Sequence, residues 1–186
     1  MLLRAATLCA LVGLVLPASA RPAARGLLFE SATRAERQTV VSALEASSFD
    51  WDVIPGPIVI HVVAGGRTQS VPGEIWLDAD LLHAGTFAWG VIQHEFAHQV
   101  DYLLLDEAQR SRLLRMLGGR DWCYEAPGLA HVEHGCERFA STLAWSFWQS
   151  PKNCMKPASA RDESAAMPPQ RFRVLLESML RNNGVR

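Results

Sequence analysis

The sequence predicts one α+β domain in which a short sheet packs on a central helix and the C-terminal part is helical. Two β-rich runs in the first half of the chain predict the sheet, and apolar residues at spacings of three and four from about residue 86 onward predict the helices. No internal repeat or composition break divides the chain after residue 20. A chain of 186 residues can also bury one core of useful size.

The first twenty residues have the layout of a secretory signal peptide. Arg4 supplies a basic start, an apolar run follows from Ala5 to Leu16, and Ala18-Ser19-Ala20 fits a small-residue cleavage site. The apolar run is shorter than the roughly 20 residues that a bilayer-spanning helix needs. We therefore expect a secreted or otherwise extracytoplasmic protein, with no stable membrane insertion after the signal is cleaved.

The segment before the first strand is expected to contain one helix. Residues 21–32, rich in Ala and Arg, are predicted to be an extended or mobile N-terminal segment, and the single domain is expected to span 33–186. The pattern Thr33-x-x-Glu36 fits a capping box and predicts a helix over 33–46.

The sheet is predicted from two runs. Residues 58–63 are rich in β-branched side chains, and Ile75 to Leu77 form a second strand candidate entered from Pro72-Gly73.

The second half of the chain is expected to hold four helices separated by turns and by two loop-like segments, 120–135 and 149–169. The approximate ranges of the helices are 86–105, 107–117, 136–148 and 168–181. Thr86 and Asp106 are suited to cap the first two helices, and Gly118-Gly119 to end the second.

Charge and composition exclude several classes of protein. The 18 Lys and Arg residues nearly balance the 19 Asp and Glu residues, for a formal net charge of −1, whereas a nucleic-acid protein usually carries a basic face or tail. A hydrophobic fraction of 49% excludes a disordered chain, although the apolar leader inflates it. The chain also lacks a Gly-x-Ser-x-Gly elbow and a phosphate-binding glycine loop. We expect a monomer.

The chemistry is concentrated in His94-Glu95-Phe96-Ala97-His98, inside the central helix. Residues four apart are separated by about 400° around a helix, so both imidazoles lie on one face and can hold one Zn²⁺. Glu95 is rotated by about 100° from His94. That position suits a general base that takes a proton from an attacking water rather than a metal ligand.

A catalytic zinc needs a third protein ligand and an open fourth position. The residues after His98 lack the glycine and histidine of the metzincin extension, so the third ligand must come from further along the chain. Glu137, in the first turn of the 136–148 helix, is the leading candidate, and His134 and Glu133 are alternatives. His134 is three residues from Glu137 and could share a helix face with it.

These motifs resemble the gluzincins, zinc metallopeptidases with His-Glu-x-x-His on one helix and a glutamate ligand on the next. Over about residues 57–148 the chain is most similar to the lethal-factor and Pro-Pro endopeptidase group, in which the third ligand opens a Glu-x-Phe-Ala helix, as Glu137-Arg138-Phe139-Ala140 does here. The thermolysin-like branch has an Asp where this chain has Ser141. The resemblance implies a small zincin-like domain, one Zn²⁺ per chain, and a strand near Ile75–Asp78 that pairs with an extended peptide substrate.

The residues leave open which side chain would donate a hydrogen bond to the oxyanion of the tetrahedral intermediate. The lethal-factor-like relatives use a tyrosine shortly before the glutamate ligand, whereas this chain has Ala130 and His131 there, and its nearest tyrosine is Tyr124. His131 is either a residue of the cleft rim or that donor, and Tyr124 is either an aromatic residue of the core or rim or a catalytic one.

Two supporting features are predicted around the site. Asp101 follows His98 by three residues and could hold its distal N–H, or it is an exposed acid. Three cysteines remain after the leader, and a Cys123–Cys136 disulfide would stiffen the loop before Glu137. The alternatives are a Cys136–Cys154 pair or no bridge.

The sequence thus favours a secreted zinc endopeptidase acting on peptide or protein substrates. The alternative is a secreted zinc-binding protein with little or no turnover. A third hypothesis is a metal-dependent hydrolase of envelope peptides or amides.

Overall fold

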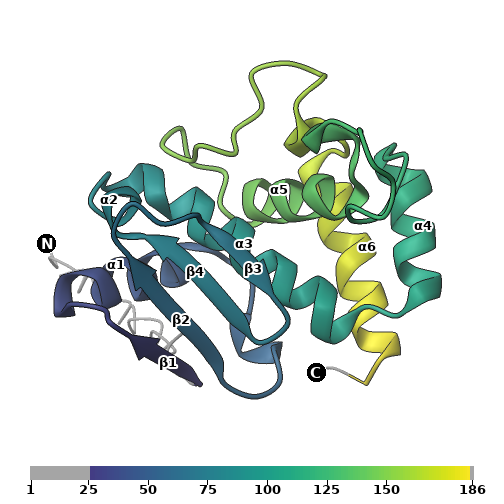
Figure 1. Ribbon diagram of the computed structural model, residues 1–186. Coiled ribbons are helices and arrows are strands. Elements are labelled where there is room, and N and C mark those ends of the chain that lie inside the picture. Colours follow the sequence, from purple (N-terminus) through teal and green to yellow (C-terminus); the bar gives the residue numbers. More distant parts are fainter. Residues whose placement is uncertain (1–25, 185–186) are drawn as a thin grey trace, which may run out of the picture.

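The computed structural model describes residues 26–184 and combines a four-stranded sheet with six α-helices (Figure 1). This agrees with the predicted mixture of helix and sheet. The predicted signal peptide over 1–20 lies outside the described residues. The strands are β1 Leu27–Glu30, β2 Ile58–Val63, β3 Gln69–Val71 and β4 Glu74–Asp78, and the α-helices are α1 Arg34–Ala46, α2 Ala79–Leu82, α3 Thr86–Leu104, α4 Glu107–Leu117, α5 Gly135–Phe147 and α6 Pro169–Asn182.

The sheet has the strand order β1-β2-β4-β3. The first three of these strands run parallel, and β3 runs antiparallel to β4. Within the segment 21–32, predicted to be extended or mobile, residues 27–30 are extended and not a mobile tail, since they form β1 and pair with β2 from Leu27 opposite Ile58. The three-residue strand β3 was also not expected. β1 is held by a strand that is distant from it in sequence, whereas β3 pairs with the next strand, β4, across the tight turn at Pro72-Gly73.

Strand β4 contains the residues that were predicted to pair with a substrate, and it is not an edge strand. It pairs with β2 on one side and with β3 on the other, so it has no free backbone for a substrate strand. The prediction that Ile75–Asp78 pairs with substrate is therefore wrong in its choice of strand. Among the described residues, β1 and β3 are the edges of the sheet.

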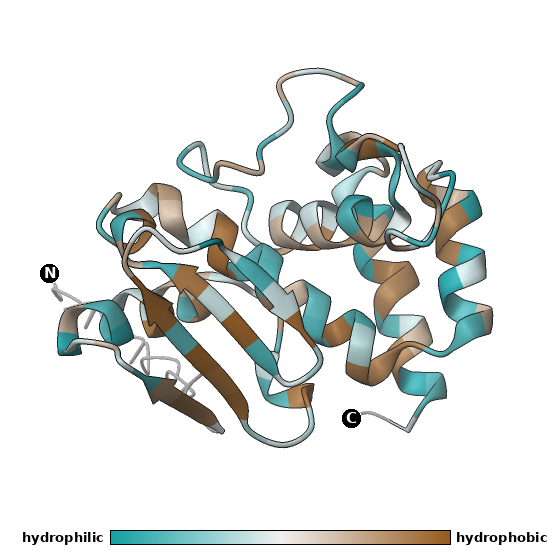
Figure 2. Cartoon of the chain, in the orientation of Figure 1, coloured by the Kyte–Doolittle hydropathy of each residue, from teal (hydrophilic) through white to brown (hydrophobic). Residues whose placement is uncertain are grey.

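The sheet and the helices share one core. Residues on β2 alternate between buried and partly exposed, and the buried ones, such as Ile60, belong to the same cluster as Ile75 and Leu77 of β4. Figure 2 shows hydrophobic stretches on these strands interrupted by more hydrophilic residues. Helices α1 and α5 pack on α3, and α3 is buried at every residue from Ile92 to Asp101.

Local capping residues set several of the predicted helix ends. Thr33 and Glu36 form the predicted capping box of α1, and Asp106 forms one with Gln109 at the start of α4. Gly118 ends α4 in the left-handed region at φ 79°. Thr86 is instead the first residue of α3, because Gly85 occupies the cap position at φ 63°.

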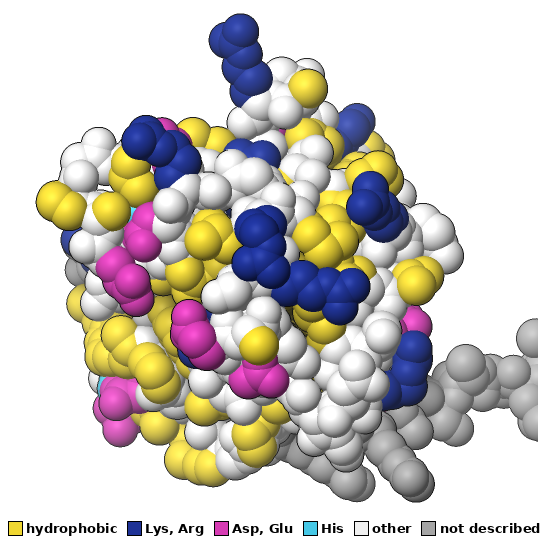
Figure 3. Space-filling model, turned by 90° about the vertical axis from the view of Figure 1, so that its right-hand side faces the viewer, with side chains coloured by type: hydrophobic (Ala, Val, Ile, Leu, Met, Phe, Trp, Pro, Cys, Tyr) yellow, Lys and Arg dark blue, Asp and Glu magenta, His cyan; other side chains and the backbone are white. Residues whose placement is uncertain are grey.

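The side of the molecule where α4 lies is seen in Figure 3. Lys and Arg side chains stand out on it among apolar and uncharged ones, with acidic side chains toward its left. Arg112 and Arg115 of α4 are exposed, as expected for residues on the solvent side of a surface helix. No helix in residues 26–184 is both long and apolar enough to cross a bilayer.

Candidate metal centre

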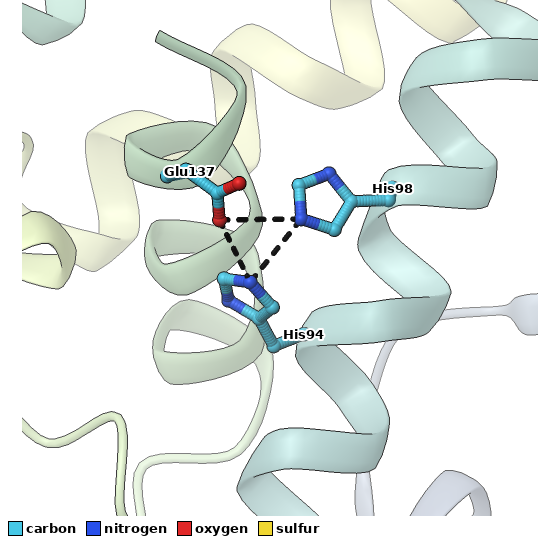
Figure 4. Close-up of side chains that lie close together, drawn as sticks. All are labelled: His94, His98 and Glu137. Carbon is cyan, nitrogen blue, oxygen red and sulfur yellow. Dashed lines mark hydrogen bonds and ion pairs between the residues drawn. The ribbon is translucent and has the colours of Figure 1, made fainter. Parts of the chain in front are cut away.

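Two neighbouring helices bring three potential metal ligands together (Figure 4). His94 and His98 project from α3, and Glu137 projects from the first turn of α5. Glu137 Oε2 lies 3.1 Å from His94 Nε2 and 3.3 Å from His98 Nε2, and the two histidine Nε2 atoms are 3.2 Å apart. All three residues are buried.

The sequence explains this convergence. The four-residue spacing stacks the two imidazoles on one side of α3, as predicted. Phe139, Ala140 and Leu143 are fully buried, which fixes the face that α5 turns toward the core. Glu137 lies within one turn of Phe139 and Ala140 and within two turns of Leu143, so the packing of α5 against α3 carries its carboxylate to the histidines.

The donor chemistry fits a metal ion. Two imidazole nitrogens and one carboxylate oxygen converge from three sides, and their lone pairs repel one another unless protons or a cation lie between them. The ligand atoms of this group all lie within 4.8 Å of one another. Two nitrogens and one oxygen also match the donors that a zinc site uses, with the fourth position left to water or substrate.

The charges at the centre respond to this crowding. Burial acts to raise the pKa of Glu137, but hydrogen bonds from His94 and His98 outweigh it and hold that pKa far below its usual range. Burial acts to lower the pKa of His98, whereas its hydrogen bond to Glu137 raises it, and the net change is upward. The carboxylate thus stays charged, and it favours the protonated form of the His98 imidazole.

Glu95 lines the same cavity as the three ligands and is itself buried. Burial raises its pKa above the ordinary glutamate value, against the attraction of the neighbouring histidines. A raised carboxyl pKa brings a general base closer to neutral pH. Glu95 lies beside the three candidate ligands, as its position on the helix predicts.

The cavity has a volume of about 530 Å³ and opens between the edge strand β3 and the segment around Tyr124. Thr68, Gln69 and Ser70 form one wall. Strand β3 is held there by α3, since the Gln99 amide donates to Val71 O at 2.8 Å and accepts from Gly73 N at 2.8 Å. The Tyr102 hydroxyl also donates to Ser70 O at 3.1 Å, so an edge strand anchored to α3 runs beside the three candidate ligands.

His131 and Tyr124 both reach the centre from the opposite wall. Tyr124 donates from its hydroxyl to Glu137 Oε1 at 2.8 Å, and His131 Nε2 lies 3.2 Å from Glu137 Oε2. The Tyr124 backbone is left-handed, at φ 60°, which is uncommon for a residue with a side chain. Burial and the bond to Glu137 raise the pKa of the phenol, so it stays a proton donor at neutral pH.

Sequence reasoning missed Glu163, which ties the two sides of the centre together. Its Oε1 lies 2.6 Å from His131 Nδ1, and its Oε2 accepts from Ser141 Oγ at 2.8 Å. Ser141 Oγ is in turn 3.1 Å from His94 Nδ1. Ser141 carried a signal, since it follows Glu137 by one helical turn. Glu163 carried none, because it lies in a long irregular segment.

The two alternative third ligands point elsewhere. His134 is buried, but its Nδ1 accepts from Tyr124 N at 3.2 Å and lies 3.4 Å from Asp121 Oδ2. Glu133 is bound to Arg120 Nη1 at 2.8 Å. Neither belongs to the metal-ligand cluster, so both alternatives are wrong for this structure. The short 3₁₀ turn His131–Glu133 before α5 directs them away.

Asp101 does not hold His98. Its carboxylate instead accepts from Arg110 Nε at 2.7 Å and from Trp122 Nε1 at 3.1 Å, while His98 Nδ1 is buried without a hydrogen-bond partner among the described residues. The prediction failed because the competing partners come from later segments of the chain. Asp101 is nevertheless almost fully buried, so the exposed alternative is wrong too.

Cys123 and Cys136 lie at disulfide distance, with their sulfurs 2.10 Å apart, as predicted. The bridge joins the residue before Tyr124 to the residue before Glu137. Cys154 is free, so the alternative pair with Cys136 is not formed.

No family model, curated protein or solved structure matches this chain.

Proposed function

We propose that the protein is a zinc-dependent endopeptidase with a zincin-like domain, of gluzincin type. The observation that carries the proposal is the convergence of His94, His98 and Glu137 within 3.3 Å of one another, with Glu95 buried beside them. Its predicted resemblance to the lethal-factor and Pro-Pro endopeptidase group supports the same conclusion. A cavity bordered by a strand edge supplies a place for a peptide.

In this proposal the three residues of the cluster hold the metal, and Glu95 is the general base. A bound Zn²⁺ supplies Lewis acidity to a carbonyl group and to water. Glu95 accepts the proton of the attacking water and then passes it to the leaving amine. Its raised pKa suits both steps near neutral pH.

Two side chains that line the cavity would stabilise the negative charge that develops on the substrate carbonyl oxygen during hydrolysis. The Tyr124 hydroxyl and the His131 imidazole both line the cavity and both contact Glu137. Either donor needs to move only from the carboxylate to a substrate oxygen nearby. Glu163 keeps His131 oriented by its bond to Nδ1, which turns Nε2 toward the cavity.

The substrate is proposed to be an extended peptide or protein segment that adds to strand β3. Main-chain hydrogen bonds to a strand edge give affinity that does not depend on the sequence of the peptide. Because β3 and the three ligands line one cavity, a strand added there passes over the metal position. The Cys123–Cys136 pair agrees with an oxidising, extracytoplasmic setting.

A digest of a degenerate peptide library tests the proposal. We expect cleavage by the zinc-loaded protein, loss of cleavage with a chelator, and recovery when zinc is restored. Bound zinc with no chelator-sensitive cleavage of any library peptide would favour a zinc-binding protein without turnover. A parallel screen of envelope peptides and amides tests the alternative that the protein is a metal-dependent hydrolase of those compounds.

A further inference from the structure

The disulfide between Cys123 and Cys136 borders the metal centre on the side away from the histidines. Cys123 is partly exposed and lines the cavity, whereas Cys136 is buried with its Sγ 4.0 Å from Glu137 Oε1. The two sulfurs and a Glu137 oxygen all lie within 4.8 Å of one another. Cys123, Cys136 and Glu137 therefore form a second set of potential ligands. This set shares Glu137 with the first one.

The two oxygens of Glu137 face different partners. Oε2 contacts His94 and His98, while Oε1 accepts from Tyr124 and lies near Cys136. A carboxylate can use its two oxygens separately toward metal ions. Glu137 Oε1 is therefore placed to bind a cation held by the sulfurs without any change of helix.

We propose that reduction of the disulfide creates a second metal site, formed by both cysteine sulfurs and Glu137, for a thiophilic divalent cation. A dithiol reductant gives two electrons and two protons to the sulfurs and closes into a cyclic disulfide. The two thiols then bind the cation as thiolates and release two protons. Soft thiolate ligands favour zinc and cobalt over magnesium or calcium.

The surroundings of the two cysteines favour this chemistry. Cys123 faces the cavity, which gives a reductant access to the bond. Cys136 N donates to Trp122 O at 2.8 Å and Asp121 forms a β-bridge with His134, so the backbone keeps the two cysteines close together after the sulfurs separate.

Cobalt titration tests the site without any reference to hydrolysis. The protein is compared in the oxidised form and after reduction by a dithiol that is removed without oxygen before Co²⁺ is added. We expect a thiolate-to-cobalt charge-transfer band only in the reduced protein. Absence of that band after reduction, confirmed by a thiol count, would overturn the proposal.

Variants assign the ligands. Cys136→Ser should lose the band, Cys154→Ser should keep it, and the double variant His94→Ala/His98→Ala should keep it as well. A band that survives in Cys136→Ser and disappears in Cys154→Ser would contradict the assignment. If a variant fails to fold, the oxidised and reduced wild-type spectra still decide the question. The proposed function and this site can fail separately. If no form of the protein cleaves peptides while the histidine variant still shows the band, the proposed function is refuted and the cysteine site is supported.

Discussion

Replacing Glu163 by glutamine is predicted to weaken metal binding although Glu163 is not a proposed ligand. The carboxylate is 19% exposed and accepts from Ser141, which contacts His94 Nδ1. It also holds His131. Glutamine has nearly the same shape but carries no charge, so its oxygen accepts from Ser141 more weakly and its amide can only donate to His131 Nδ1.

The magnitude follows from the kind of hydrogen bond that is lost. A hydrogen bond to a charged group contributes about 1.5–3 kcal/mol, and a neutral one about 0.5–1.5 kcal/mol. The difference of about 1–1.5 kcal/mol corresponds to roughly tenfold in affinity. Ser141→Ala removes the direct partner of His94, and loss of such a partner typically weakens metal binding by about 10–100-fold.

The assay is competition for zinc between the protein and a chromogenic chelator. Glu177→Gln is the matched control, because Glu177 is exposed on α6 and, within residues 26–184, pairs only with Arg181 at 3.7 Å. We expect weaker zinc binding in Glu163→Gln and Ser141→Ala and an unchanged affinity in the control. Wild-type affinity in Glu163→Gln, with its fold intact, would refute the role assigned to this network.

Three further predictions concern stability. Gly90→Ala should destabilise the protein by about 1–3 kcal/mol in urea unfolding, because an added Cβ would meet Cys154 Sγ at 2.6 Å; an unchanged midpoint would contradict the tight approach. Glu36→Gln should be less stable than wild type at pH 7, by up to about 1 kcal/mol, because bonds from Thr33 lower the pKa of Glu36. Its contribution is present above the unfolded pKa of about 4.3 and is lost as pH falls through the lower folded pKa, so the two proteins should converge below that folded pKa; a constant difference would contradict the sign. Zinc at about 1,000 times its Kd should raise the unfolding free energy by about 4 kcal/mol, measured as a rise in Tm, and no rise would argue against a folded-state site.

Local patterns predicted the helices well because caps and apolar periodicity lie within single segments. Thr33 with Glu36, and Asp106 with Gln109, mark their helices in the sequence and in the structure. The strands β1 and β3 are only four and three residues long, so neither gave a reliable period, and β1 in addition pairs with a strand distant in sequence. The same gap led to the wrong choice of β4 as the edge.

At the site, the sequence placed the residues whose positions follow from helix geometry. His94 and His98 are related by one helical turn, and Glu137 follows once α5 packs on α3. Asp101 was misassigned because Arg110 and Trp122 compete for it across the fold. Glu163 reaches the centre from an irregular segment, where spacing carries no information about direction.

We propose that His94, His98 and Glu137 hold the metal while Glu95 moves the proton. The Glu95→Gln variant tests this division of roles most directly. Zinc content and cleavage of the peptide library are measured on the same zinc-loaded sample, beside wild type. We predict about one zinc per chain in both proteins and cleavage by wild type alone. Cleavage by Glu95→Gln at the wild-type rate, with the same zinc content, would contradict the proposed mechanism.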